Sequence, residues 1–284
     1  MTELRQPLPL PEVAAMKRAG TKIVMVTAYD YPSARLASEA GIELLLVGDS
    51  AGNNVLGYDT TVPVSMEEVV MLTAAVGRAR PRALIIGDMP FGSFQASDED
   101  AVANAVRLVK VGADAVKLEG AGPMASRVRA IVGAGIPVMG HLGLTPQSAT
   151  MLGGMKAQGR TAANAHRLLD DARELEAAGC FSLVLEAVPA KVAAHITEAL
   201  EIPTIGIGAG AGCDGQVLVW HDLLGVNQGA APRFVKRYAD VAGEIRRGLE
   251  TFAAEVRSGA YPADEHAYKI SEDELRAFEA GLSD

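Results

Sequence analysis

Short apolar runs rich in Val, Ile and Leu alternate along the chain with longer, Ala-rich stretches in which apolar residues recur at helical spacing. Continuous apolar runs of this length are typical of strands that are buried on both faces of a parallel sheet. Such runs occur at residues 22–28, 43–48, 83–88, 114–119, 136–141, 181–186, 202–207 and 216–220. The pattern therefore predicts eight parallel strands connected by helices.

The amphipathic stretches predict helices, several of which carry recognisable start and stop residues. Ser97, three residues before Asp100, indicates a helix start, and Gly112 and Gly179 lie where helices should stop. The expected helices are residues 31–41, 65–79, 97–113, 123–135, 161–179, 189–201 and, after the last strand, 232–256. The glycine-rich residues 208–215, between the last two strands, leave little room for a helix.

This order of elements in 284 residues predicts a single-domain (β/α)8 TIM barrel over about residues 20–258, with an open doubly wound sheet as the alternative. Residues 7–20 are expected to form a helix that closes one end of the barrel. The charged residues 259–284 are expected to form a helical C-terminal extension of the same domain. In a barrel, the carboxyl ends of all strands meet at one face, and that face carries the active site.

The chain is acidic, because 35 Asp and Glu residues outnumber 26 Lys and Arg residues and give a net charge of -9. This charge opposes binding to nucleic acid and to anionic membranes. The N-terminus lacks the pattern of a signal peptide, and no apolar run approaches the roughly 18 residues of a membrane span, so a cytoplasmic protein is expected. Cys180 and Cys213 lack metal-ligand spacing and are interpreted as unpaired thiols.

Polar residues, many of them acidic, follow the ends of the predicted strands: Tyr29, Asp30, Asp49, Ser50, Asp88, Lys117, Glu119, His141 and Glu186. The carboxylates among them would repel one another at a barrel mouth unless protons or a cation neutralised them. Oxygen ligands without cysteine favour a hard ion such as Mg²⁺. Asp49 and Asp88 are the first candidates, although an Asp after a strand is also a common turn residue or helix cap.

Each of the other strand-end groups allows more than one interpretation. Lys117 and Glu119 are two residues apart on a strand and therefore point the same way. Lys117 could bind a substrate carboxylate, form a Schiff base, or belong to an internal ion pair. His141 is either functional or a hydrogen-bonded core histidine, and Glu186 either abstracts a proton or caps the next helix. Glycines within residues 206–212 resemble a phosphate-binding loop, but close packing explains them equally well.

Eight motifs occur in a characteristic order: VTAYD, VGDS, GYDTTVPVS, DMPFGS, VKLEG, GHLGLTPQS, LEAVP, and IPTIGIGAG followed by CDGQVLV. From about Lys22 to about Tyr238 the chain closely resembles the ketopantoate hydroxymethyltransferase family. The resemblance implies a Mg²⁺-dependent barrel enzyme of pantothenate and coenzyme A synthesis. Such an enzyme adds a one-carbon unit from 5,10-methylenetetrahydrofolate to 3-methyl-2-oxobutanoate through an enolate, giving 2-dehydropantoate. The resemblance also implies a homo-oligomer, commonly a decamer.

The resemblance further assigns roles to individual residues. It implies that the metal-site carboxylates are Asp49, Asp88 and Glu119, with Glu119 acting through water, and that the 2-oxo acid contacts Ser50, Lys117 and the two aspartates. Glu186 would be the proton acceptor, and His141 is a second catalytic candidate. Gly87 and Ala187 depart from residues common in relatives, Ala and Cys, but neither change removes a functional group.

Two other classes of protein compete with this interpretation. A Mg²⁺-dependent lyase or mutase of the phosphoenolpyruvate mutase and isocitrate lyase type would share the barrel and the carboxylate-bound metal. It would need a nucleophilic cysteine motif or a phosphonate site, which the sequence does not show. A catalytically inactive barrel that serves as a binding module is disfavoured by the intact acids, lysine and histidine at the strand ends.

Overall fold

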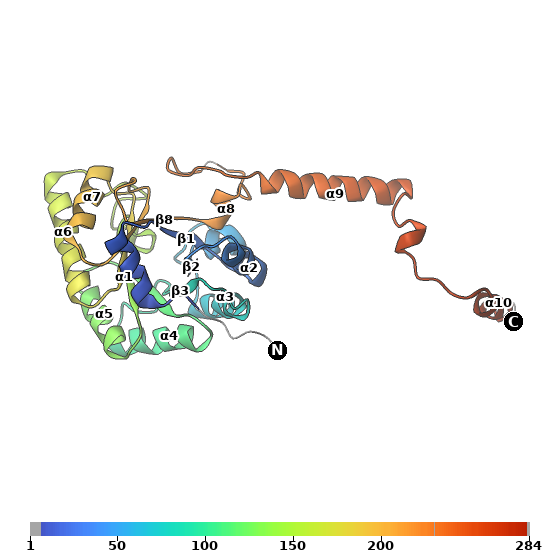
Figure 1. The fold of residues 1–284 in the computed structure, drawn as a ribbon, viewed down its shortest axis with the longest axis horizontal. Helices are drawn as coiled ribbons and strands as arrows, with labels where there is room; N and C mark the ends of the chain where they lie inside the picture. The colour runs from blue at the N-terminus through green and yellow to red at the C-terminus, as the bar shows by residue number, and fades with distance from the viewer. Residues whose placement is uncertain (1–6, 230, 283–284) are drawn as a thin grey trace. The chain divides into compact units, whose positions relative to one another are not determined.

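Eight parallel strands form a closed barrel in the computed structural model of the chain, which describes residues 7–229 and 231–282 (Figure 1). The strands pair in chain order, and β8 closes the barrel by pairing with β1. Their bounds are β1 Ile23–Thr27, β2 Leu44–Val47, β3 Leu84–Asp88, β4 Ala115–Glu119, β5 Val138–Gly143, β6 Ser182–Glu186, β7 Thr204–Ile207 and β8 Gly215–Leu218. The predicted (β/α)8 fold class is confirmed.

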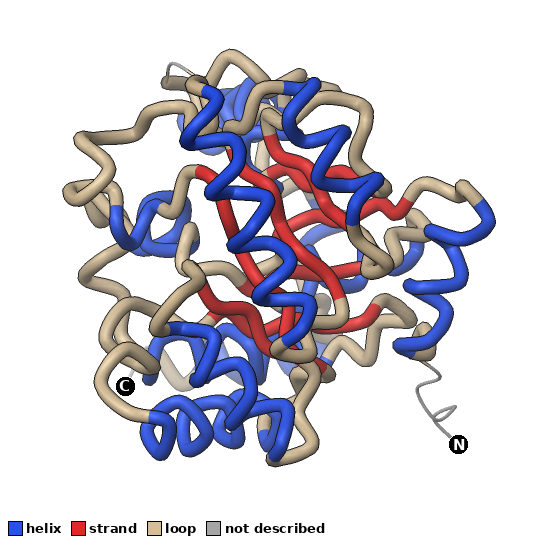
Figure 2. Tube along the Cα trace, turned by 90° about the vertical axis from the view of Figure 1, so that its left-hand side faces the viewer, coloured by secondary structure: helices blue, strands red, loops and turns tan. Residues whose placement is uncertain are grey.

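Helices connect most of the strands and lie around the outside of the sheet (Figure 2). The α-helices are α1 Leu10–Ala19, α2 Tyr31–Glu39, α3 Met66–Arg78, α4 Asp98–Lys110, α5 Met124–Gly133, α6 Ala162–Ala177, α7 Ala190–Ala199, α8 Trp220–Leu223, α9 Val241–Ser258 and α10 Glu272–Ala280. Shorter helical turns are η1 Gly52–Leu56, η2 Pro146–Ser148 and η3 Asp264–His266. Ser97 caps α4 by accepting a hydrogen bond from the amide of Asp100, as the sequence predicted.

The core has two layers that follow from the alternation of side chains along each strand. One layer fills the barrel and includes Ile23, Met25 and Leu44, and the other packs between the strands and the outer helices. Val13 and Met16 of α1 belong to the inner layer. Lys17 of α1 donates to the backbone oxygens of Thr197 and Ile202, which precede β7. Helix α1 therefore closes the amino-terminal end of the barrel, as predicted.

Strands β5 and β7 begin two residues later than the sequence indicated, because a proline precedes each of them. Pro137 and Pro203 lack the amide hydrogen that a ladder requires, so β5 begins at Val138 and β7 at Thr204. The loop 208–214 between β7 and β8 contains no helix, as expected.

The prediction of one helix over 232–256 is wrong at its start, because α9 begins only at Val241. Phe234 instead packs against Gly208, where an added Cβ would lie 2.6 Å from the phenyl ring. The amide of Tyr238 donates to the backbone oxygen of Leu223. These tertiary contacts hold the segment against the barrel and override its helical pattern.

The chain divides into two compact units, Met1–Tyr238 and Ala239–Asp284. The first contains the whole barrel. Helix α9, which the sequence analysis assigned to the barrel, lies in the second unit together with α10. Among the described residues, no helix is both long enough and apolar enough to cross a membrane.

Candidate active site

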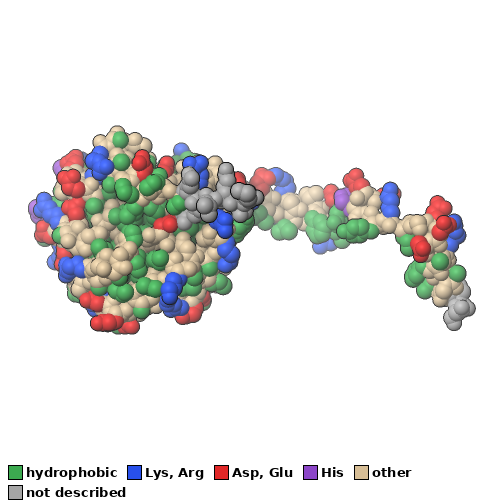
Figure 3. All heavy atoms as spheres, turned by 60° about the horizontal axis from the view of Figure 1, so that its bottom comes forward, with side chains coloured by type: hydrophobic (Ala, Val, Ile, Leu, Met, Phe, Trp, Pro, Cys, Tyr) green, Lys and Arg blue, Asp and Glu red, His purple; other side chains and the backbone are tan. Residues whose placement is uncertain are grey.

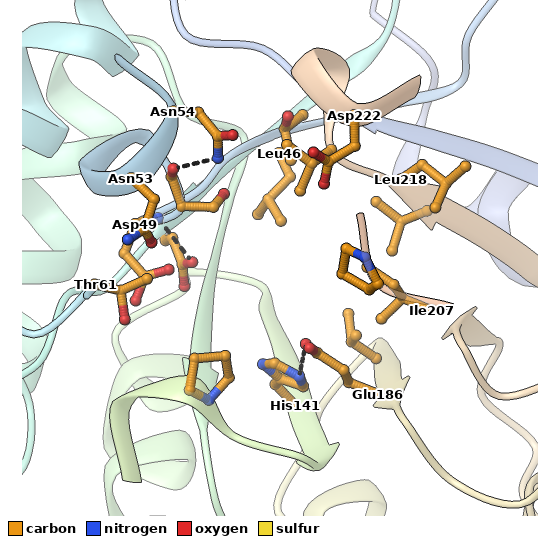
Figure 4. A pocket seen from close by; sticks show the side chains of 18 of the residues that line it. Leu46, Asp49, Asn53, Asn54, Thr61, His141, Glu186, Ile207, Leu218 and Asp222 are labelled. Atoms are coloured by element: carbon orange, nitrogen blue, oxygen red, sulfur yellow. Dashed lines mark hydrogen bonds and ion pairs between the residues drawn. The ribbon is translucent and has the colours of Figure 1, made fainter. Parts of the chain in front are cut away.

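A cavity of about 290 Å³ opens at the carboxyl ends of the strands (Figure 4). It is lined by every residue to which the sequence assigned a role: Asp49, Ser50, Asp88, Lys117, Glu119, His141 and Glu186. Asp30, which was expected at the same face, does not line it, because its carboxylate caps α2 by accepting from the amide of Ser33 at 2.7 Å. The hydroxyl of Tyr29 lies 2.8 Å from that of Ser50.

Asp88 and Lys117 form a buried ion pair at one side of the cavity. The two residues are register partners on β3 and β4, and Lys117 Nζ lies 2.6 Å from Asp88 Oδ1. The other oxygen of Asp88 accepts from the amide of Asp49 at 3.2 Å. Burial lowers the pKa of Lys117, but the attraction of Asp88 and Glu119 outweighs it, and the pKa lies above its ordinary value. Lys117 is therefore a cation at neutral pH.

Asp49 is a buried carboxyl group with an unusual affinity for a proton. Burial, and then repulsion by Asp88, raise the pKa of Asp49 to about 7. Burial also raises the pKa of Asp88. Gln147 Nε2 donates to Asp49 Oδ2 at 2.9 Å and to the backbone oxygen of Met89 at 3.0 Å, which fixes the carboxylate in place. Lys117 therefore neutralises only one of these two neighbouring carboxylates.

This pair fits a hard cation such as Mg²⁺. Within residues 7–229 and 231–282, no three His, Cys, Asp or Glu side chains are grouped so that they could hold an ion by themselves. Mg²⁺ commonly takes one or two carboxylates and completes its shell with water and substrate oxygens. Both oxygens of Glu119 are already engaged, Oε1 by His141 and Oε2 by the amide of Gln147 at 3.1 Å. Asp88 is likewise engaged at both oxygens, by Lys117 and by the amide of Asp49, and each of these carboxylate oxygens keeps a second lone pair.

His141 joins two carboxylates across the cavity. Its Nδ1 lies 3.3 Å from Glu119 Oε1, and its Nε2 lies 3.2 Å from Glu186 Oε2 (Figure 4). Burial and the nearby Lys117 lower the pKa of His141, but the bonds to the two carboxylates outweigh them and raise it to about 9. Burial raises the pKa of Glu119, yet the bond to His141 more than compensates and lowers it. The imidazole is therefore protonated at neutral pH and forms an ion pair with each carboxylate.

Sequence reasoning missed Gln147 and Phe234. Gln147 is buried and bonds to both Asp49 and Glu119, and its signal was its place in the motif GHLGLTPQS directly after a strand. Phe234 lines the cavity from a segment that was expected to be helical, so no local signal marked it. The glycine-rich loop is explained by packing, since an added Cβ at Gly210 would lie 2.4 Å from that of Ala190.

The fold and the site together define a (β/α)8-barrel enzyme whose acid and base groups meet at the carboxyl ends of the strands. Similar barrels occur in "Phosphonopyruvate Hydrolase Complex with Oxalate and Mg++", with a TM-score of 0.60, 12% identity and 96% of each chain covered. Another is 2,3-dimethylmalate lyase, of the PEP mutase/isocitrate lyase superfamily, with a TM-score of 0.56, 15% identity and coverage of 96% of this chain and 98% of that one. At such identities the likeness shows the fold alone.

A sequence model of the family described as ketopantoate hydroxymethyltransferase matches residues 8–264. Two relatives are named 3-methyl-2-oxobutanoate hydroxymethyltransferase. The one from Moorella thermoacetica is 57% identical over 266 residues, covering 93% of this chain and 99% of the relative. The one from Thermotoga neapolitana is 56% identical over 247 residues, covering 87% and 92%. The chain therefore belongs to the ketopantoate hydroxymethyltransferase family, as its motifs indicated.

Proposed function

We propose that the protein adds a one-carbon unit from 5,10-methylenetetrahydrofolate to C3 of 3-methyl-2-oxobutanoate, giving 2-dehydropantoate and tetrahydrofolate for pantothenate synthesis. The C3–H bond and the two bonds from the methylene carbon to the folate nitrogens break. The methylene carbon bonds to C3 and to the oxygen of water, and the C3 proton and one water proton go to the two nitrogens of tetrahydrofolate. The observation that carries the proposal is one cavity with a protonated lysine, a pair of aspartates and a histidine-held carboxylate. These groups can hold a cation, bind the carboxylate of a 2-oxo acid and accept the C3 proton, which are the three functions that the reaction needs.

Asp49 and Asp88 would hold Mg²⁺ directly, and Glu119 would contact it through water. When bound, the cation supplies Lewis-acid polarisation of the 2-oxo group, which makes the C3 proton more acidic. The neighbouring Gln147 amide keeps the Asp49 carboxylate oriented.

Lys117 and Ser50 would bind the 2-oxo acid, with Lys117 attracting its carboxylate. The raised pKa of Lys117 keeps its amine protonated and disfavours a Schiff base, which needs a neutral amine. Ser50 is positioned by the hydroxyl of Tyr29, which lies 2.8 Å away.

Glu186 would accept the C3 proton. Its Oε2 is held by His141, while its Oε1 has no hydrogen bond to the described part of the chain. The protonated His141 both orients the carboxylate and stabilises its charge before the transfer. A general base is typically a side chain that a neighbouring group holds in one orientation, as His141 holds Glu186.

The fold alone also suits a lyase or mutase of the phosphoenolpyruvate mutase and isocitrate lyase type. That chemistry would need a nucleophilic cysteine motif or a phosphonate site, and neither Cys180 nor Cys213 lines the cavity. Burial raises the pKa of the Cys180 thiol to about 12, which suppresses the reactive thiolate. The transferase is therefore the better supported activity.

The test is to incubate the protein with 3-methyl-2-oxobutanoate, Mg²⁺ and either 5,10-methylenetetrahydrofolate or formaldehyde, and to detect 2-dehydropantoate by mass spectrometry. Product is expected with the folate donor and should disappear when EDTA removes the cation. Cleavage of the 2-oxo acid without a new carbon bond would support the lyase instead. Absence of any turnover with every donor would contradict the proposed function.

A further inference from the structure

A second cavity, of about 470 Å³, adjoins the catalytic one. Phe234 lines both. In three segments of the chain, one residue lines the catalytic cavity and the next residue lines the second cavity. The pairs, with the catalytic-cavity residue first, are Glu186 and Ala187, Ile207 and Gly208, and Pro232 and Arg233. The two cavities therefore lie on either side of a wall that includes Phe234.

The second cavity has the charge of an anion-binding site. Among the described residues that line it, the charged ones are Arg160 and Arg233, and no carboxylate is present. Neither guanidinium forms an ion pair with a carboxylate in the described part of the chain. Both guanidinium groups are therefore available to an anionic ligand. Arginine forks recognise carboxylates with two parallel hydrogen bonds.

The start of α7 adds to this positive character. Ala190, its first residue, lines the second cavity, and no side chain caps the helix at Pro189. Gly210 permits the loop after β7 to lie against Ala190, and both residues line the second cavity. Uncapped amides at a helix N-terminus attract anions.

We propose that Arg160 and Arg233 bind the glutamate carboxylates of the folate donor in this second cavity. The proposal rests on the function proposed above, in which the donor presents its methylene carbon to C3 in the catalytic cavity. In the donor, an aromatic aminobenzoyl ring separates that methylene from the anionic glutamate. The shared Phe234 offers a surface for the ring, and Arg160 and Arg233 line the same second cavity for the carboxylates.

The test is the double variant Arg160→Gln/Arg233→Gln, assayed with donors that carry one or three glutamates at saturating 2-oxo acid. The KM for the donor is expected to rise about tenfold, and more for the triglutamate, because exposed charge pairs contribute modestly and their effects add. Arg160→Lys/Arg233→Lys should restore part of the affinity, because lysine keeps the charge but cannot form the two parallel hydrogen bonds. Arg78→Gln, at the carboxyl end of α3, is the matched control and should leave the KM unchanged.

Two further measurements separate this inference from the proposed function. Deuterium exchange at C3 of the 2-oxo acid needs no folate and should be the same in the double variant as in the wild type. Tetrahydropteroate, which lacks glutamate, should bind both proteins equally in calorimetry, whereas tetrahydrofolate should bind the wild type more tightly. An unchanged donor KM in the double variant, with active wild-type protein, would overturn the inference alone. Inactive wild-type protein would instead overturn the proposed function.

Discussion

At the scale of single residues, the site is governed by competition among buried charges. Lys117 stays protonated because Asp88 lies 2.6 Å away, and His141 stays protonated because two carboxylates flank it. Burial, and then repulsion by Asp88, raise the pKa of the Asp49 carboxyl to about 7, whereas the bond to His141 helps to lower the pKa of the Glu119 carboxyl. The same chemical groups therefore differ in protonation according to which partner each one meets.

Glu186→Gln should slow deuterium exchange at C3 of 3-methyl-2-oxobutanoate by roughly 10²- to 10⁴-fold, because the amide cannot accept the proton. The exchange is measured by NMR without folate. Glu198→Gln, on the exposed surface of α7, is the matched control and should retain the wild-type rate. An undiminished rate in a folded Glu186→Gln protein would remove Glu186 as the base.

Asp49→Asn and Asp88→Asn should each weaken Mg²⁺ binding by at least about tenfold, the loss typical of removing even an outer partner of a metal. Isothermal calorimetry measures the affinity. Asp30→Asn is the control, because Asn also caps helices well and Asp30 lies outside the cavity. Retained affinity in both site variants would place the cation elsewhere.

Protonation of His141 should make the folded state depend on pH. Its pKa is about 9 in the fold and about 6.5 when unfolded, so its stabilising contribution is complete below about pH 6.5 and is lost as pH rises through about 9. Urea unfolding with EDTA should show a loss of roughly 2–3 kcal/mol across this interval. His141→Asn should flatten that dependence, and an identical slope in both proteins would contradict the assignment.

At the scale of elements, the site depends on how closely β5 and β6 approach. Gly143 ends β5 opposite Glu186, with φ of +93°, and an added Cβ would lie 2.2 Å from the backbone oxygen of Glu186. Only glycine permits this approach. The position of the proposed base is therefore set by a residue on the neighbouring strand.

Gly143→Ala should destabilise the protein by more than about 2 kcal/mol and reduce C3 exchange, because clash is added to backbone strain. Gly57→Ala is the matched control, since Gly57 has φ of +75° but no atom within 4 Å of its added Cβ. The control should cost only about 1 kcal/mol. Equal losses of unfolding free energy in the two variants would show that clash contributes nothing.

At the scale of the whole molecule, charges of both signs are interspersed over the barrel surface that Figure 3 displays. The C-terminal unit differs, because apolar side chains line one side of α9. They are Ile245, Leu249, Phe252 and Val256, each about half exposed or more and spaced to share one helical face. Such a stripe suits burial against a second copy of the chain, which accords with the predicted homo-oligomer.

Leu249→Glu should therefore lower the native mass measured by size-exclusion chromatography with light scattering, because a charge on the stripe opposes its burial. Glu250→Gln, the neighbouring residue off the stripe, should leave the mass unchanged. A wild-type monomer, or an unchanged mass in Leu249→Glu, would contradict a role for α9 in assembly.

The sequence by itself predicted a parallel α/β fold, with the barrel ahead of an open doubly wound sheet, and most of the site. Continuous apolar runs are typical of a parallel sheet with both faces covered, and parallel strands direct their polar ends to one face, which placed Asp49, Asp88, Lys117, Glu119 and Glu186 together. Motif order then identified the family.

The tertiary structure alone decided the contacts between distant segments. It turned Asp30 away from the cavity as a helix cap, brought Gln147 onto Asp49, and held Phe234 at the barrel instead of in a helix. Local patterns describe burial and spacing within one segment. They carry no information about which partner a polar group meets across the fold, and that partner sets both its pKa and its role.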